Sequence, residues 1–161
     1  MRRIAIQVAA FVIAFNISAQ EIKPVSKIED LDAIKQSSKG KVVLYNFWAT
    51  WCKPCVVEFP ELMKLYNNYK DKGLEIIFVS LDVPEDIETK VKPFLIKNGV
   101  EFTTYFSKFS KEEDLINYYD KEWVGAIPST YIYDKEGVLQ KKILGSKSYE
   151  QFENEVKALL N

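Results

Sequence analysis

Two kinds of segment alternate along this chain, one short and almost wholly apolar, the other amphipathic. Residues 42–48 and 74–81 are nearly continuous apolar runs, a pattern typical of strands buried on both faces of a sheet. Residues 54–72 instead carry apolar side chains at spacings of three and four, which predicts a helix ended by Gly73. Further helices are predicted over 28–37, 85–98, 111–119 and 148–160, and further strands over 101–106, 130–133 and 138–144.

The order of these segments predicts an α/β fold with three layers. Strands that alternate with helices are expected to be parallel and to lie at the centre of a sheet. The last two strands are separated by the turn sequence Asp-Lys-Glu-Gly at 134–137, which indicates an antiparallel hairpin at the sheet edge. The final helix begins with a capping box, in which Ser148 is followed three residues later by Gln151. We therefore expect a central mixed sheet flanked by helices.

The first 19 residues differ in composition from the rest of the chain. Arg2 and Arg3 are followed by residues 4–17, which contain no charged side chain, and then by Ala19. A basic start, a short apolar stretch and a small residue at the cleavage point are features of a secretory signal peptide. We therefore predict a signal peptide over 1–19, a single domain over 20–161, and a periplasmic or otherwise extracytoplasmic location. The alternative is an N-terminal membrane anchor, although the apolar run is shorter than the about 20 residues of a typical span.

The composition excludes several classes of chemistry. The chain has no histidine and two cysteines, which removes His-dependent hydrolases and leaves too few ligands for a zinc site. Lysine and arginine number 22 against 23 acidic residues, so there is no basic excess to bind nucleic acid. No glycine-rich nucleotide loop is present either. We predict no metal and no bound cofactor.

The strongest motif is WATWCKPC at residues 48–55, between a predicted strand and a predicted helix. At this spacing Cys52 and Cys55 can form a disulfide within one helical turn. The free N–H groups and partial positive charge of a helix N-terminus stabilise a thiolate, so Cys52 is the predicted nucleophile and the less exposed Cys55 the resolving thiol. The alternatives are an incidental pair, half of an intersubunit metal site, or a structural disulfide, which would remove little chain entropy from so short a loop.

The sequence resembles the thioredoxin superfamily, and more closely its TlpA/ResA-like extracytoplasmic thiol-disulfide oxidoreductases. The resemblance covers about residues 40–160. It is carried by NFWATWCKPC at 46–55, EFP at 58–60, GAIPST at 125–130, Tyr133-Asp134, Gly137 and Gly145. It implies a thioredoxin-like fold with a TlpA-type helix–strand insertion over 84–106.

The resemblance also implies a substrate-binding surface around the two thiols. Pro128 corresponds to the family's cis-proline, whose loop lies against the disulfide, and Ile127 would line the contact with an extended substrate chain. Trp51 and Pro54 complete the predicted substrate-binding residues. The alternative for Pro128 is an ordinary proline at a strand edge. Trp123, just before this loop, either contacts substrate or packs in the interior.

Two further positions distinguish subgroups of the superfamily. Cytoplasmic thioredoxins usually carry a buried aspartate where Asn46 stands, and an asparagine cannot take up a proton at neutral pH. Glu58 corresponds to a glutamate of the ResA-like members and lies one helical turn after Cys55. A partly buried carboxylate there would have a raised pKa and could carry a proton to or from Cys55 as a catalytic residue. The alternative is a solvated helix carboxylate.

These features together predict a protein thiol-disulfide oxidoreductase whose redox group is the cysteine pair itself. The resemblance favours a reductase of disulfides in other secreted proteins, supplied with electrons by a membrane thiol donor. The alternatives are a disulfide-donating oxidase or isomerase, a thiol peroxidase, and a redox-inert binding module. Substrate proteins with disulfides or thiols are the expected partners, and nothing in the sequence demands more than a monomer.

Overall fold

The structure is a computed structural model that describes residues 20–160; the predicted signal peptide lies outside this range. Within it, six strands form one sheet in the order β1-β4-β3-β2-β5-β6. The strands are β1 Ile22–Val25, β2 Val42–Trp48, β3 Leu74–Ser80, β4 Thr104–Ser107, β5 Ser129–Tyr133 and β6 Leu139–Leu144. The helices are α1 Ile28–Ser37, α2 Lys53–Tyr69, α3 Lys92–Lys97, α4 Glu112–Tyr119 and α5 Tyr149–Leu160.

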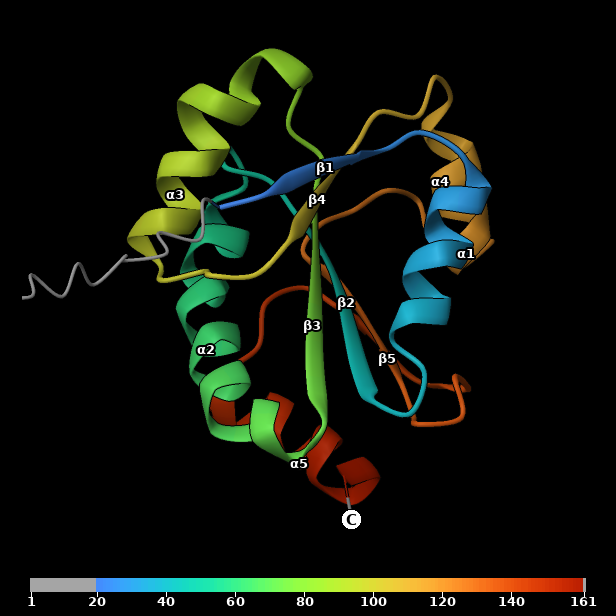
Figure 1. The fold of residues 1–161 in the computed structure, drawn as a ribbon. Helices are drawn as coiled ribbons and strands as arrows, with labels where there is room; N and C mark the ends of the chain where they lie inside the picture. Colours follow the sequence, from blue (N-terminus) through green and yellow to red (C-terminus); the bar gives the residue numbers. More distant parts are fainter. Residues whose placement is uncertain (1–19, 161) are drawn as a thin grey trace, which may run out of the picture.

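Strand β2 lies inside the sheet and contributes to the core on both of its faces. All seven of its residues are buried, as its apolar run predicts. Because side chains alternate across a strand, Leu44 and Trp48 pack on one face with α2, α3 and α5, while Tyr45 and Phe47 pack on the other with α1 and α4. Figure 1 shows the same division, with α2, α3 and α5 on one side of the sheet and α1 and α4 on the other. The predicted three-layer α/β fold is confirmed.

The pairing of the strands also follows the prediction. Strands β2 and β3 run parallel, β2 and β5 run antiparallel, and β5 and β6 form the expected antiparallel hairpin. In this register Asn46 lies opposite Thr130 on the neighbouring strand. The capping box at the last helix is present too, since Ser148 and Gln151 exchange hydrogen bonds.

A first strand that the sequence did not predict covers one edge of the sheet. Strand β1 pairs in parallel with β4, and Ile22 lies opposite Thr104. Its four residues carry Lys23 and Pro24 between the two apolar positions, so the segment has too few apolar side chains to stand out. Tertiary pairing with β4, rather than local preference, makes it a strand.

The segment predicted as a helix over 85–98 is helical, but it is not one regular α-helix. The chain forms a 3₁₀-helix at Pro84–Asp86, a π-helix at Ile87–Val91 and then α3. Pro93 in the first turn of α3 has no N–H to donate to the carbonyl four residues earlier, so an uninterrupted α-helix would lack that bond. The helix–strand insertion itself is present, because β4 follows and pairs with both β3 and β1.

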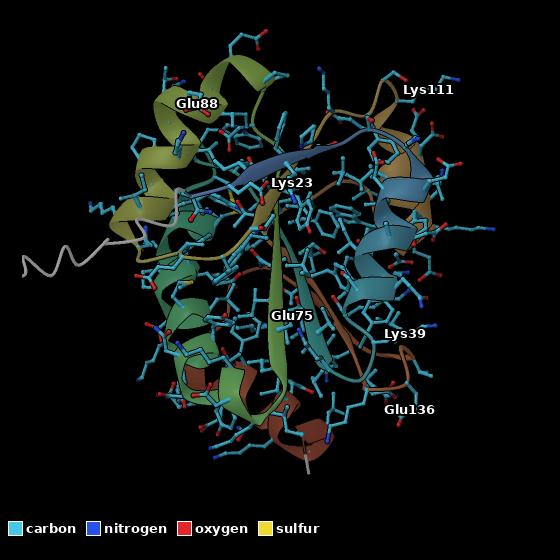
Figure 2. The ribbon with its side chains drawn as sticks, viewed as in Figure 1. Lys23, Lys39, Glu75, Glu88, Lys111 and Glu136 are labelled. Atoms are coloured by element: carbon cyan, nitrogen blue, oxygen red, sulfur yellow. A yellow bond between two sulfur atoms is a disulfide. The ribbon has the colours of Figure 1, made fainter. Side chains whose placement is uncertain are left out.

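Charged side chains are spread over the outside of the molecule. The labelled residues Lys39, Glu88 and Glu136 in Figure 2 are all exposed and lie on separate elements or turns, while the space between sheet and helices is filled by other side chains. Within residues 20–160, no helix combines the length and the apolar character that crossing a membrane requires.

Candidate active site

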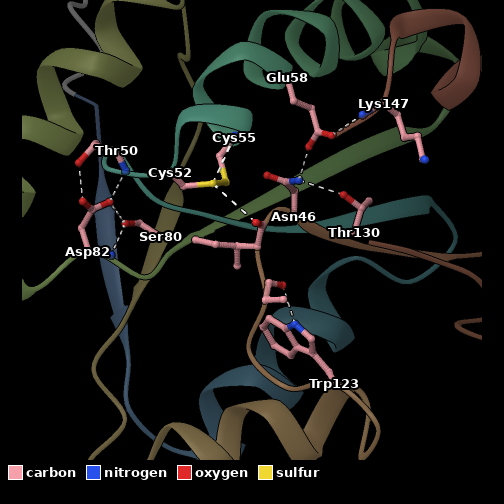
Figure 3. Close-up of a disulfide and its surroundings, with 12 residues drawn as sticks. Asn46, Thr50, Cys52, Cys55, Glu58, Ser80, Asp82, Trp123, Thr130 and Lys147 are labelled. Atoms are coloured by element: carbon pink, nitrogen blue, oxygen red, sulfur yellow. Dashed lines mark hydrogen bonds between the residues drawn. A yellow bond between two sulfur atoms is a disulfide. The ribbon is translucent and has the colours of Figure 1, made fainter. Parts of the chain in front are cut away.

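The two cysteines form a disulfide at the start of α2, after a short turn that follows strand β2. The S–S bond is 2.01 Å long and the two Cα atoms are 5.3 Å apart. Cys52 is the N-cap residue of α2, and its sulfur accepts a hydrogen bond from the backbone N–H of Cys55 at 3.3 Å. Both residues are buried, Cys52 with 6% of its surface exposed and Cys55 with 2%. Figure 3 shows the disulfide at the start of the helix. In the dithiol form the same N–H group and the helix terminus would stabilise a Cys52 thiolate.

The loop before β5 closes over the disulfide. Its Ile127–Pro128 peptide bond is cis, as the resemblance implies, and Pro128 is buried. The carbonyl oxygen of Ile127 lies 3.8 Å from the Cys52 sulfur. Trp123 stabilises the loop through a hydrogen bond. Its indole Nε1 donates to the carbonyl of Ala126 at 2.8 Å, and only 7% of the Trp123 surface is exposed. Of the two possibilities for Trp123, the structure therefore supports packing.

Glu58 is buried on the α2 side of the sheet, with 2% of its surface exposed. One carboxylate oxygen accepts from Nδ2 of Asn46 at 3.1 Å, and the other from the backbone N–H of Lys147 at 2.8 Å. Asn46 also donates to the hydroxyl of Thr130 at 2.9 Å. Asn46 and Thr130 are cross-strand neighbours whose side chains lie on the same face as α2, so the sheet itself presents this polar pair to the helix (Figure 3).

These surroundings raise the pKa of Glu58. Burial raises the pKa of its carboxyl to about 7, although the hydrogen bonds from Lys147 and Asn46 act in the opposite direction. The carboxyl therefore exchanges its proton near neutral pH. Cys55 lies three residues earlier on the same helix, which places the two side chains on neighbouring turns of one face. The possibility that Glu58 is a solvated helix carboxylate is excluded by its burial.

The other predicted site residues lie at the protein surface next to the disulfide. Trp51 is 66% exposed and Pro54 is also exposed, each within two residues of Cys52. Val124, in the loop before the cis-proline, is 86% exposed. The two loops that flank the disulfide thus offer apolar surface to the solvent. Residues 20–160 contain no group of three or more His, Cys, Asp or Glu side chains arranged to hold a metal ion.

The sequence reasoning missed one polar cluster beside the disulfide. Asp82, just beyond β3, is 2% exposed and accepts hydrogen bonds from Thr50 and Ser80. One feature of the sequence could have indicated it. Asp82 is a carboxylate directly after a buried strand, at the end of the parallel pair β2–β3 where Cys52 also lies. Without the fold, nothing connected it to Thr50, 32 residues earlier.

A disulfide at a helix N-terminus that faces a cis-proline loop on a sheet of this order defines the class of thioredoxin-fold thiol-disulfide oxidoreductases. Sequence comparison agrees with this class. Residues 11–142 match the AhpC/TSA family, and the chain belongs to that family.

Individual proteins similar to this chain are thiol-disulfide oxidoreductases and related thioredoxin-fold proteins. The chain is 36% identical over 135 residues to the thiol-disulfide oxidoreductase ResA of Bacillus thuringiensis (strain Al Hakam), covering 82% of this chain and 73% of the relative. It is 38% identical over 129 residues to a ResA of Bacillus cereus, covering 78% and 69%. Among solved structures, a putative thiol:disulfide interchange protein DsbE from Chlorobium tepidum superposes with a TM-score of 0.64 at 28% identity, covering 78% of this chain and 84% of that one. StoA from Bacillus subtilis shares the fold, with a TM-score of 0.56 at 23% identity, covering 73% and 84%.

Proposed function

We propose that this oxidoreductase works outside the cytoplasm as a reductase of disulfides in other proteins and is itself reduced by a membrane thiol donor. The observation that carries the proposal is the grouping of a disulfide at the N-terminus of α2 with the buried Glu58 one turn further along the helix. This grouping supplies a nucleophile, a resolving thiol and a group that exchanges protons near neutral pH. The likeness to the ResA relatives supports the reducing direction.

The reaction begins with the dithiol form. The Cys52 thiolate, stabilised by the N–H of Cys55 and the helix terminus, attacks one sulfur of a substrate disulfide and releases the other substrate sulfur as a thiolate. The Cys55 thiolate then attacks the Cys52 sulfur of this mixed disulfide and releases the second substrate thiol. Two electrons pass to the substrate, and the Cys52–Cys55 disulfide is formed. A dithiol of the donor protein restores the reduced state by the reverse exchange.

Glu58 serves in the second step as the base for Cys55. Cys55 is almost fully buried, so its thiol cannot lose a proton directly to bulk water before it attacks. A Glu58 carboxylate with a pKa of about 7 can take this proton, and it can return one when the disulfide is reduced again. The substrate chain lies against the surface around the disulfide. This surface consists of the exposed Trp51 and Pro54 and of the loop that contains Ile127 and the buried Pro128.

The reduction potential of the Cys52–Cys55 pair tests the direction. It is measured by equilibration against a dithiol buffer. A value near or below about −250 mV would support the reductase, whereas about −120 to −180 mV would assign the protein to disulfide donation or isomerisation. Rapid consumption of hydrogen peroxide, without reduction of a protein disulfide, would instead support a peroxidase.

Two cysteine variants test the assigned roles. With Cys55→Ser, the reaction should stop at a mixed disulfide between Cys52 and the substrate, detectable as a covalent adduct on a non-reducing gel. With Cys52→Ser, no adduct should form at a comparable rate. Equal adduct formation by the two variants would contradict the assignment. The N-terminal sequence of the protein recovered from its native cell envelope tests the predicted cleavage after Ala19.

A further inference from the structure

The buried carboxylate of Asp82 lies beside the redox turn and has no part in the mechanism above. It accepts from the backbone N–H of Thr50 at 2.9 Å, from the Thr50 hydroxyl, and from the Ser80 hydroxyl at 2.7 Å. All three donors are neutral. A carboxylate that is 2% exposed and held only by neutral donors is costly to bury. Its position therefore calls for an explanation.

The network begins where the regular pairing of β2 and β3 stops. Trp48 and Ser80 are the last paired residues, and the N–H of Leu81 still donates to the carbonyl of Trp48 at 2.8 Å. Beyond this point the side chain of Asp82 replaces a strand partner. Its carboxylate accepts a hydrogen bond from the backbone N–H of Thr50, two residues after the end of β2. The N–H of Asp82 itself donates to the Ser80 hydroxyl at 3.0 Å, which fixes the carboxylate in place.

Thr50 lies in the four-residue turn 49–52 that joins β2 to α2. The turn is closed by a hydrogen bond from the N–H of Cys52 to the carbonyl of Ala49 at 3.2 Å. Asp82 holds the turn at its second residue, through both backbone and side chain, as Figure 3 shows. The path of this turn decides whether Cys52 reaches the N-cap position of α2 and whether its sulfur faces the Ile127 carbonyl.

We propose that Asp82 is a positioning residue for Cys52, acting through Thr50 to hold the turn 49–52 in the conformation that places the Cys52 sulfur at the helix terminus. The proposal rests on the thiol-disulfide exchange proposed above, but it concerns the geometry of one thiol and can be tested without a substrate. Loss of the network lets the turn move, and the Cys52 thiolate then loses the N–H of Cys55 that stabilises it.

The test is the second-order rate constant for alkylation of Cys52 by iodoacetamide in the reduced protein at neutral pH. Asp82→Ala should lower this rate about tenfold or more, because Cys52 then loses the N–H of Cys55 and a smaller fraction of its thiol is ionised at neutral pH. Asp82→Asn should stay within about threefold of the unaltered protein, because the amide can accept from the Thr50 N–H and donate to the Thr50 hydroxyl. An Asp82→Asn rate as low as that of Asp82→Ala would overturn positioning through these hydrogen bonds, because the amide keeps both of them.

A second pair of variants covers the case in which Asp82→Ala does not fold. Thr50→Val removes the hydroxyl donor and keeps the shape of the side chain, while Thr50→Ser restores the donor. The proposal requires Thr50→Val to react several-fold more slowly and Thr50→Ser to recover the rate. Equal rates for the two Thr50 variants, or an Asp82→Ala rate within twofold of the unaltered protein, would refute it.

Asp134 provides the matched control at the opposite end of the sheet. It also accepts three hydrogen bonds within a turn, from the N–H groups of Glu136 and Val138 and from Gln140. Asp134→Ala should lower the stability of its turn but leave the alkylation rate unchanged. If the unaltered protein fails to reduce a protein disulfide while the variants still differ in alkylation rate, the proposed function fails and the positioning of Cys52 stands.

Discussion

The replacement Glu58→Gln offers a direct test of the buried carboxyl. Burial raises the pKa of Glu58 from its ordinary value of 4.5 to about 7. Below about pH 4.5 the group is protonated in both the folded and the unfolded chain, so it makes no difference to stability. As the pH rises towards 7, the unfolded chain gives up the proton first and the folded state is increasingly disfavoured. The free energy of unfolding should therefore fall with rising pH, and the decline should end just above pH 7.

The size of the effect follows from the two pKa values. Integrating the linkage between about pH 5 and pH 8 gives a loss of about 2.5 kcal/mol that Glu58→Gln, which has no titrating group, does not show. The oxidised protein is the right sample, because cysteines in a disulfide do not titrate. The chain also has no histidine, so the side chain that usually titrates in this range is absent.

The assay is urea unfolding of the oxidised protein and of the variant at a series of pH values, with unfolding free energies taken by linear extrapolation. The result is the difference in unfolding free energy between the protein and the variant at each pH, because the contributions of the other carboxylates cancel in this difference. Glu88→Gln makes the same chemical change at an exposed side chain and controls for the loss of a charge. Curves for Glu58→Gln and the unaltered protein that stay parallel within about 0.5 kcal/mol would refute the assignment of a raised pKa to Glu58.

Three further outcomes are expected. Phe59→Ala should lower the free energy of unfolding by about 3–5 kcal/mol in urea, because the ring is 1% exposed and packed among other aromatic rings of the α2 face; a loss below about 1 kcal/mol would contradict this packing. Trp51→Ala should raise the KM for a protein disulfide several-fold with a stability change within about 0.5 kcal/mol, whereas Ile96→Ala, also at an exposed apolar side chain, should change neither. Asn46→Leu removes a hydrogen bond that lowers the pKa of Glu58, so the pH at which stability declines should move upward; a downward move would contradict the role of Asn46.

The elements with strong local patterns could be predicted from the sequence, and those that depend on a distant partner could not. The apolar run of β2 and the spacing of apolar residues in α2 are properties of the segments themselves, and both were found at nearly their observed bounds. Strand β1 exists only through its pairing with β4, 82 residues away at Thr104. The helix over 85–98 was expected between Pro84 and Asn98-Gly99, and these boundary residues do not show that Pro93 interrupts the regular α-helical hydrogen bonds between them.

The same distinction applies to the site. The cysteines, Glu58, Pro128 and the loop around Ile127 lie in motifs that can be read along the chain, and the structure brings them to one end of the sheet. Two of the residues that hold them in place could not be predicted from the sequence. Lys147 reaches Glu58 through its backbone N–H, and a backbone group carries no sequence signal. Asp82 joins Thr50 across two parallel strands, and only the register of β2 against β3 brings them together.

The partners of Glu58 explain how a chain without histidine obtains a group that titrates near neutral pH. A carboxylate in water would be fully ionised there, and a carboxylate buried without donors would remain protonated. Glu58 lies between these limits, because hydrogen bonds from the N–H of Lys147 and from Asn46, together with the positive charge of Lys147, offset part of the cost of its burial. A third donor would return its pKa towards the ordinary value, and the removal of one would raise it further. Under the proposed mechanism, the donors around the carboxyl thus set the pH range in which it can accept the proton of Cys55.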